Sequence, residues 1–103
     1  MHATMTTTHG STEDMASVAV ITGEALVSWL RDIEGFLGLI FLTHEPTGTA
    51  QVIAFWESEE VAERHRAARL RLRDRITSTV DVEVKDTVGY DVPYADMPTV
   101  RAP

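Results

Sequence analysis

The sequence predicts a single α+β domain whose elements follow the order strand, helix, strand, strand, helix, strand. Two segments repeat their apolar residues with the period of a helix, and four segments have the β-branched, aromatic or alternating character of strands. A four-residue turn signal joins the two middle strands and indicates a β-hairpin. The chain has 103 residues, of which 44% are hydrophobic, and this is enough for one core but not for two.

The first predicted strand covers residues 2–9, a threonine-rich run that ends before Gly10. Ser11 or Thr12 can cap the helix that follows, and Gly35 is expected to end that helix. The buried face of the helix is predicted from the residues that coincide at helical spacing, namely Met15, Ala19, Thr22, Leu26, Trp29, Leu30 and Ile33.

Residues 36–44 and 49–57 are two apolar, strand-like runs joined by the turn Glu45-Pro46-Thr47-Gly48. This turn predicts a register in which paired residues have numbers that sum to 93. Trp56 then shares a face of the hairpin with Leu37, Leu39, Phe41, Val52 and Ala54. The other face carries Ile40, Leu42, Ile53 and Phe55. We expect the Trp56 face to pack against the helices.

The second predicted helix starts after the N-cap Ser58 and continues without a break to Ile76 or Thr77. Its inward face is expected to contain Val61, His65, Ala68, Leu72 and Ile76. The six arginines between Arg64 and Arg75 lie beside or behind that face, so most of them are expected to be solvated.

A fourth strand is predicted from the strict alternation of apolar and polar residues between Val80 and Lys85. The segment 91–103 holds three of the four prolines and has no apolar period, so it is expected to form an arm or a loose tail. The predicted domain therefore covers residues 1–90.

Both faces of the hairpin strands are apolar, whereas two helices can cover only one face of a four-stranded sheet. The remaining apolar face is as large as the exposed patches that soluble monomers tolerate. We therefore expect a homodimer whose interface contains Ile40, Leu42, Ile53 and Phe55.

The composition excludes several classes of partner. A net charge of −7 repels phosphate backbones and anionic lipid surfaces, so neither nucleic acid nor a membrane is expected to bind. The longest apolar run, from Leu37 to Leu42, is far shorter than a membrane helix. The chain has no cysteine and no signal-peptide pattern, and both features predict a cytoplasmic protein.

Two short motifs resemble one family. They are Gly35-Phe36-Leu37-Gly38 at the start of the second strand and Phe55-Trp56-Glu57-Ser58-Glu59-Glu60 before the helix that carries His65. Together with the order of elements, they resemble the antibiotic-biosynthesis-monooxygenase-like proteins over residues 2–90. This resemblance implies a ferredoxin-like βαββαβ protomer that pairs with a second copy to form a dimeric α/β barrel.

The resemblance further implies a cofactor-independent monooxygenase that acts on an aromatic or polyketide-like molecule. In such enzymes an electron-rich phenolate reacts with oxygen itself, and the protein binds and deprotonates the substrate. His65 would act as a base or hydrogen-bond partner, Arg69 would stabilise an oxyanion, and Trp56 would complete the catalytic group. The pocket for the small molecule would be lined by Trp29, Leu26, Leu39, Phe41 and Leu72.

Two other functions stay open at this point. The chain can be a homodimer that binds a hydrophobic small molecule without catalysis, or a divergent haem-binding relative. Haem degraders of the family use an asparagine on the first strand, but this chain contains no asparagine and has Thr4, Thr6 and Thr8 there. His65 also has a structural interpretation, because histidines on apolar helix faces commonly pack in the core.

No metal is predicted. His2, His9 and His44 lie near strand ends, and the sequence places no second ligand at metal-binding spacing beside any of them. Arg69 likewise has an ordinary interpretation as the partner of Glu63 or Asp74 in a surface ion pair.

Overall fold

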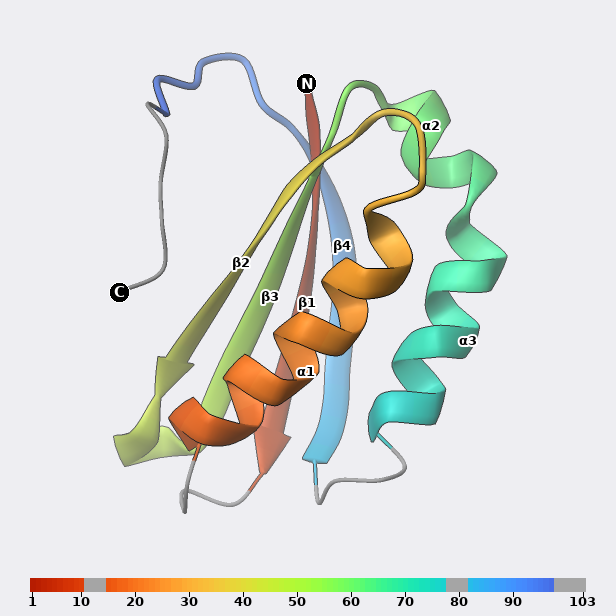
Figure 1. Cartoon of the computed structure of the whole chain (residues 1–103). Coiled ribbons are helices and arrows are strands. Elements are labelled where there is room, and N and C mark those ends of the chain that lie inside the picture. Colours follow the sequence, from red (N-terminus) through yellow and green to blue (C-terminus); the bar gives the residue numbers. More distant parts are fainter. Residues whose placement is uncertain (11–14, 78–81, 98–103) are drawn as a thin grey trace.

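The structure is a computed structural model and describes residues 1–10, 15–77 and 82–97 (Figure 1). The strands are β1 (His2–Gly10), β2 (Phe36–His44), β3 (Thr49–Trp56) and β4 (Val82–Asp91), and the helices are α1 (Met15–Leu30), α2 (Glu59–Arg64) and α3 (Arg66–Thr77). This order confirms the predicted α+β class. The expected helix caps at residues 11 and 12 and the expected strand start at residue 80 lie outside the described residues.

The four strands form one antiparallel sheet in the order β2-β3-β1-β4. All three helices lie on the same face of this sheet (Figure 1). Helix α1 packs on β2, α2 packs on β1 and β3, and α3 packs on β4. The arrangement is ferredoxin-like, and no described helix covers the second face of the sheet.

The hairpin has the predicted register from Gly38↔Phe55 to His44↔Thr49. Its turn is a short 3-10 helix, η1 (Glu45–Thr47), closed by Gly48 in the left-handed conformation with φ of 66°. The Gly48 N–H donates to the carbonyl of Glu45 at 3.0 Å. A Cβ at Gly48 would collide with the Gly10 carbonyl oxygen, so the position suits glycine.

The prediction for Leu37 was wrong because the register shifts between Phe36 and Gly38. This bulge places Phe36 opposite Trp56, with ring centroids 5.5 Å apart in an edge-to-face arrangement. Leu37, which the unbroken register put beside Trp56, is 51% exposed. An extra residue in one strand reverses the side on which the preceding residues point.

The core lies between the sheet and the helices, as the assignment of the Trp56 face predicted. Trp56 and Ala62 are fully buried, and Leu30 and Ala54 are nearly so. The face of α1 that packs here includes Leu26, Trp29 and Leu30, in agreement with the predicted helical pattern.

Helix α1 ends at Leu30, before the expected boundary at Gly35. The chain turns through residues 31–34, and Gly35 adopts a φ of 93°. A Cβ at Gly35 would lie 2.8 Å from Val61 Cγ1, so this glycine lets the connection approach α2 closely.

The second predicted helix is interrupted, which the sequence did not indicate. The Ser58 hydroxyl caps its start by accepting a hydrogen bond from the Val61 N–H at 3.2 Å. The helix then breaks at His65, whose φ of −106° and ψ of 10° are not helical. Arg69 donates to the carbonyl of Ala62 at 2.8 Å across this break, so a side chain replaces part of the lost backbone bonding.

Strand β4 continues past Lys85, where the predicted alternation ended, as far as Asp91. β4 extends this far because it pairs with all of β1, from Gly10↔Val82 to His2↔Asp91. Among the described residues, no helix is both long enough and apolar enough to cross a membrane.

Candidate functional site

A cavity of about 90 Å³ lies between the sheet and helices α1 and α3. One water molecule needs roughly 10–15 Å³ of such space, so the cavity is a chamber and not a small packing defect. Most of its wall is apolar and comes from Leu26, Trp29, Leu30, Leu39, Val52, Ala54, Trp56, Leu70 and Leu72. Its polar groups are arginine side chains and the hydroxyls of Thr4, Thr6, Thr22 and Thr87.

Trp56 is held firmly in the wall of this chamber. Its indole Nε1 donates to the Thr4 hydroxyl at 3.2 Å, and the ring of Phe36 packs edge-on against it. The side chain is fully buried. Since both the polar end and the ring are fixed by neighbours, Trp56 presents a rigid aromatic surface to the chamber.

Arg69 lies over the face of Trp56, with its Cζ 5.1 Å from the ring centroid. This cation–π contact brings a positive charge into an apolar chamber. Burial lowers the pKa of Arg69, Glu63 raises it and Arg66 lowers it further. Arginine still stays charged at neutral pH because its ordinary pKa is so high.

The guanidinium of Arg69 is only partly satisfied. Nη2 donates to the Ala62 carbonyl, whereas the buried Nε has no hydrogen-bond partner among the described residues. A buried donor of this kind costs free energy unless it is matched by an acceptor. The chamber therefore contains a cation that can donate a hydrogen bond to an anionic or strongly polar group of a ligand.

A second, polar space of about 320 Å³ adjoins the chamber. The two spaces share Thr4, Arg69, Leu70, Arg73 and Thr87, so they lie next to each other along α3 and the sheet. We call this polar space the vestibule. Its other lining residues are Glu63, Arg66 and Gly89, and its charged groups are thus three arginines and one glutamate.

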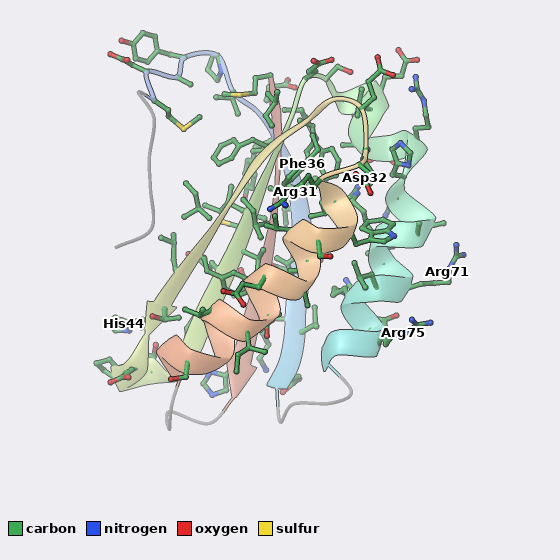
Figure 2. All side chains as sticks on the ribbon, viewed as in Figure 1. Arg31, Asp32, Phe36, His44, Arg71 and Arg75 are labelled. Atoms are coloured by element: carbon green, nitrogen blue, oxygen red, sulfur yellow. The ribbon has the colours of Figure 1, made fainter. Side chains whose placement is uncertain are left out.

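The arginines of α3 divide into two sets. Arg71 and Arg75 are exposed and point away from the sheet (Figure 2). Arg69 and Arg73 line the cavity, one helical turn apart. Arg73 donates to the Thr87 hydroxyl at 3.0 Å and to Asp74 at 2.9 Å. Arg64, Arg66, Arg71 and Arg75 are exposed, which confirms the expectation that most of the six arginines are solvated; Arg69 and Arg73 are the exceptions.

The structure brings together most of the residues that the sequence analysis assigned to a pocket. Trp29, Leu26, Leu39 and Leu72 line the chamber with Trp56 and Arg69. Phe41 is not a lining residue, because it packs on α1 beside Gly23, where an added Cβ would lie 3.4 Å from its ring. His65, at the break between α2 and α3, is half-buried and lies outside the lining of both spaces.

Sequence analysis did not single out Thr4, Arg73 or Thr87 as site residues. Thr4 pairs with Ala54 and Thr6 pairs with Thr87, so the threonines of β1 and β4 lie in rows that continue the Trp56 face. The signal in the sequence was the alternating threonines of the first strand. It becomes informative only when the pairing of the strands is known.

The four residues predicted for a dimer interface lie together on the face of the sheet without helices. Ile40 pairs with Ile53, and Phe55 lies opposite Gly38 and Ala3. Ile40 and Leu42 are 37% and 46% exposed. Leu37, Val88 and Tyr90 are further exposed apolar residues of the strands.

Known structures with the same fold cover nearly the whole chain. A monooxygenase encoded by ActVA-Orf6 of Streptomyces coelicolor, in complex with nanaomycin D, is 17% identical with a TM-score of 0.71, covering 95% of this chain and 92% of that one. SnoaB, a cofactor-independent oxygenase from Streptomyces nogalater, is 15% identical with a TM-score of 0.61, covering 91% and 95%.

A further structure, described as an antibiotic biosynthesis monooxygenase, is 18% identical with a TM-score of 0.61 and covers 89% of this chain and 98% of that one. No protein-family model and no curated protein matches the sequence. Identities this low establish the fold and not the reaction. The chain therefore has the fold of the antibiotic biosynthesis monooxygenases.

Proposed function

We propose that this protein binds a small, electron-rich aromatic molecule in the chamber and promotes its oxygenation without a cofactor. The observation that carries the proposal is the pairing of Arg69 with Trp56, which places a partly unsatisfied cation against an aromatic wall. A planar phenol fits this pairing, because its ring can pack on apolar side chains while its oxygen accepts from the guanidinium.

The chemistry requires the substrate to react as an anion. A positive charge in a site of low dielectric stabilises a phenolate more than the neutral phenol, so Arg69 favours loss of the proton. For an anthrone-like substrate, oxygen then adds to the electron-rich ring carbon. One oxygen atom becomes the carbonyl oxygen, and the other leaves as water with the two hydrogens of the substrate CH₂ group.

We assign no direct proton transfer to His65, because it lies outside the residues that line the chamber and the vestibule. The haem-binding alternative gains no support either, because the described residues that line the chamber include no histidine. The bound phenol instead loses its proton to solvent at the vestibule, next to the arginines, and Arg69 stabilises the phenolate that forms.

Two proteins with the same fold support this proposal. The ActVA-Orf6 monooxygenase was solved with nanaomycin D, and SnoaB is a cofactor-independent oxygenase. The chamber supports it through its aromatic and cationic surfaces. The vestibule would hold the more polar end of an extended substrate beside Arg66 and Arg73.

We also propose that a second copy of the chain covers the open face of the sheet and completes a dimeric α/β barrel. Ile40, Leu42, Ile53 and Phe55 would form the interface, joined by Leu37 and Tyr90. Support comes from the apolar character of this face, which is unusual for a surface exposed to water. The pairing of two such faces would remove the exposed side chains from solvent.

A non-catalytic binding function is the second candidate, and one observation favours it. Among the described residues, the chamber is lined by no histidine and no carboxylate, so its wall offers hydroxyls and arginines but no conventional base. A protein that only binds an aromatic anion needs nothing more than this.

Oxygen consumption with a hydroxyanthrone tests the proposal. We expect turnover by the wild type, and a loss of at least about tenfold in kcat/KM for Arg69→Ala, since a hydrogen bond to a charged group contributes about 1.5–3 kcal/mol. Arg71→Ala is the matched control, because Arg71 is on the same helix and points to solvent. Equal rates with and without protein would exclude oxygenation of this substrate.

The same variants separate catalysis from binding. Quenching of tryptophan fluorescence by the hydroxyanthrone reports occupancy of the chamber, because Trp29 and Trp56 both line it. Binding that depends on Arg69 but produces no oxygen uptake would favour the binding function. Binding that is identical in the wild type, Arg69→Ala and Arg71→Ala would refute both functions at this site.

A further inference from the structure

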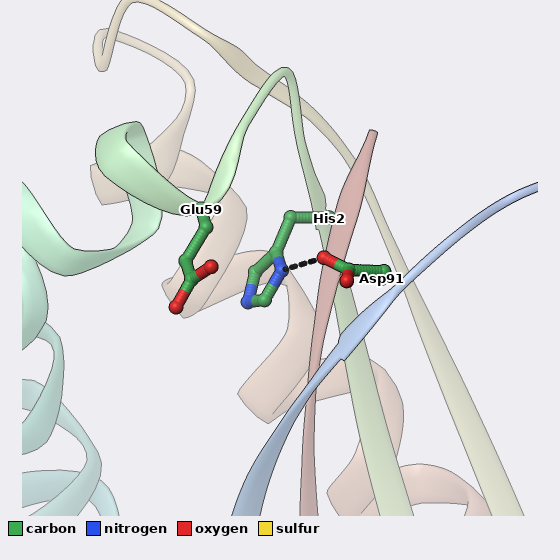
Figure 3. A group of neighbouring side chains, drawn as sticks. All are labelled: His2, Glu59 and Asp91. Carbon is green, nitrogen blue, oxygen red and sulfur yellow. Dashed lines mark ion pairs between the residues drawn. The ribbon is translucent and has the colours of Figure 1, made fainter.

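We infer that His2, Glu59 and Asp91 form a binding site for a divalent first-row transition metal such as Zn²⁺. One ligand atom from each of the three residues can be chosen so that all lie within 4.8 Å of one another. They come from three separate elements: the start of β1, the start of α2 and the end of β4. The His2 ring lies between the two carboxylates (Figure 3).

His2 carries the inference, because its surroundings require an explanation. The residue is only 6% exposed, and its Nδ1 has no hydrogen-bond partner among the described residues. Asp91 Oδ1 lies 3.6 Å from this Nδ1, which is within the range of an ion pair but too long for a hydrogen bond (Figure 3). A buried imidazole nitrogen without a partner is costly, and a bound ion is one of the few ways to satisfy it.

The strand pairing explains why these residues meet. His2 pairs with Trp56 on one side and with Asp91 on the other, so the three lie in one row across the sheet. Gly89, two residues before Asp91, makes room for the imidazole, since a Cβ there would lie 2.9 Å from His2 Nε2. Glu59 is contributed by the first turn of α2, directly above this end of the sheet.

The distances between the ligand atoms suit a small cation with tetrahedral coordination. Bonds of about 2.0–2.1 Å to nitrogen and oxygen place neighbouring ligand atoms roughly 3.4 Å apart. The 3.6 Å between His2 and Asp91 is already close to that separation. Glu59 is exposed, so its side chain can rotate to close the remaining distance.

The donor set selects the class of metal. One imidazole and two carboxylates suit Zn²⁺ and its neighbours, whereas Mg²⁺ and Ca²⁺ prefer oxygen ligands alone. Two carboxylates also neutralise the charge of a divalent ion. Because Asp91 and Glu59 face solvent, a fourth position stays accessible to water. Such a site would fasten the start of β1 and the end of β4 to α2, next to the vestibule residue Gly89.

The test is a Zn²⁺ titration by calorimetry of untagged protein that has been stripped with a chelator. We expect one ion per chain and a melting temperature that rises with Zn²⁺, because an ion that binds only the folded state stabilises it. Glu59→Gln and Asp91→Asn should each raise Kd by at least about tenfold. Both side chains are exposed, so these variants are expected to fold normally, which circular dichroism checks.

The control must exclude binding by the chain terminus, since an α-amino group and the imidazole of His2 can chelate a metal without any fold. Binding of that kind would survive Glu59→Gln and Asp91→Asn and would persist in urea. Glu60→Gln is the matched control, because Glu60 is adjacent to Glu59 but pairs with Arg64 at 3.1 Å. Either no binding of Zn²⁺, or binding unaffected by the Glu59 and Asp91 variants, would overturn the inference.

Discussion

The two faces of the sheet both carry apolar side chains, but they differ in what lies beside those side chains. The face covered by helices borders a cavity that also contains the hydroxyls of Thr4, Thr6 and Thr87 and two arginine side chains of α3. The open face instead exposes large apolar side chains such as Leu37, Leu42 and Tyr90. We therefore propose the covered face as the binding site for an aromatic molecule and the open face as the interface with a second copy of the chain.

The difference teaches how a small sheet can serve two purposes. Alternation places successive side chains of one strand on opposite faces, so each strand contributes to both. In β3, Ala54 and Trp56 build the chamber, while Ile53 and Phe55 lie on the open face. A substitution in this strand is therefore expected to affect one face and to leave the other largely unchanged.

Trp56→Ala is expected to have the largest effect, because Trp56 is fully buried on the covered face. Removal of a buried aromatic side chain typically costs about 3–5 kcal/mol of stability. Urea unfolding followed by circular dichroism measures this loss. A decrease below about 1 kcal/mol would show that the chamber wall is not part of the core.

Ile40→Asp tests the open face and should have the next largest effect. A charge placed in the proposed dimer interface should raise the dissociation constant of the dimer at least tenfold, or about 1.4 kcal/mol. Sedimentation equilibrium measures the change in the dissociation constant. When the wild type and Ile40→Asp are compared in the same oligomeric state, quenching of their tryptophan fluorescence by the hydroxyanthrone should be equal. An unchanged dimer would remove Ile40 from the interface.

Ser58→Ala should have the smallest effect, because it removes only one hydrogen bond, at the start of α2 on the covered face. The hydroxyl accepts from the Val61 N–H at 3.2 Å, and loss of such a cap costs about 1 kcal/mol. Urea unfolding again reports the value. Ser58→Asp, which restores a capping oxygen, should recover most of it; failure to recover would mean that the cap is not the cause.

Local patterns predicted the fold well. The hairpin register followed from the turn at residues 45–48, because a short turn fixes the pairing of the strands it joins. The bulge at Leu37 and the break at His65 could not be predicted in this way. The bulge lies beside Gly38, a residue type that often marks a bulge inside a strand, whereas no glycine or proline lies near the break at His65.

The candidate site could be predicted only in part, for a related reason. Trp56 and Arg69 were predicted through the resemblance to the family, and both line the chamber. Thr87 and Arg73 meet across α3 and β4, and His2 meets Glu59 and Asp91 across three elements. Such groupings depend on the order of the strands, which helical or strand periodicity does not contain.

Binding of a matched pair of ligands tests the central claim most directly. The pair is a hydroxyanthrone and its methyl ether, which have the same rings but differ in the ability to form a phenolate. The wild type should bind the phenol at least tenfold more tightly than the ether, about 1.4 kcal/mol, and Arg69→Ala should abolish this preference. Equal affinity of the wild type for the two ligands would contradict the role given to Arg69 and the covered face.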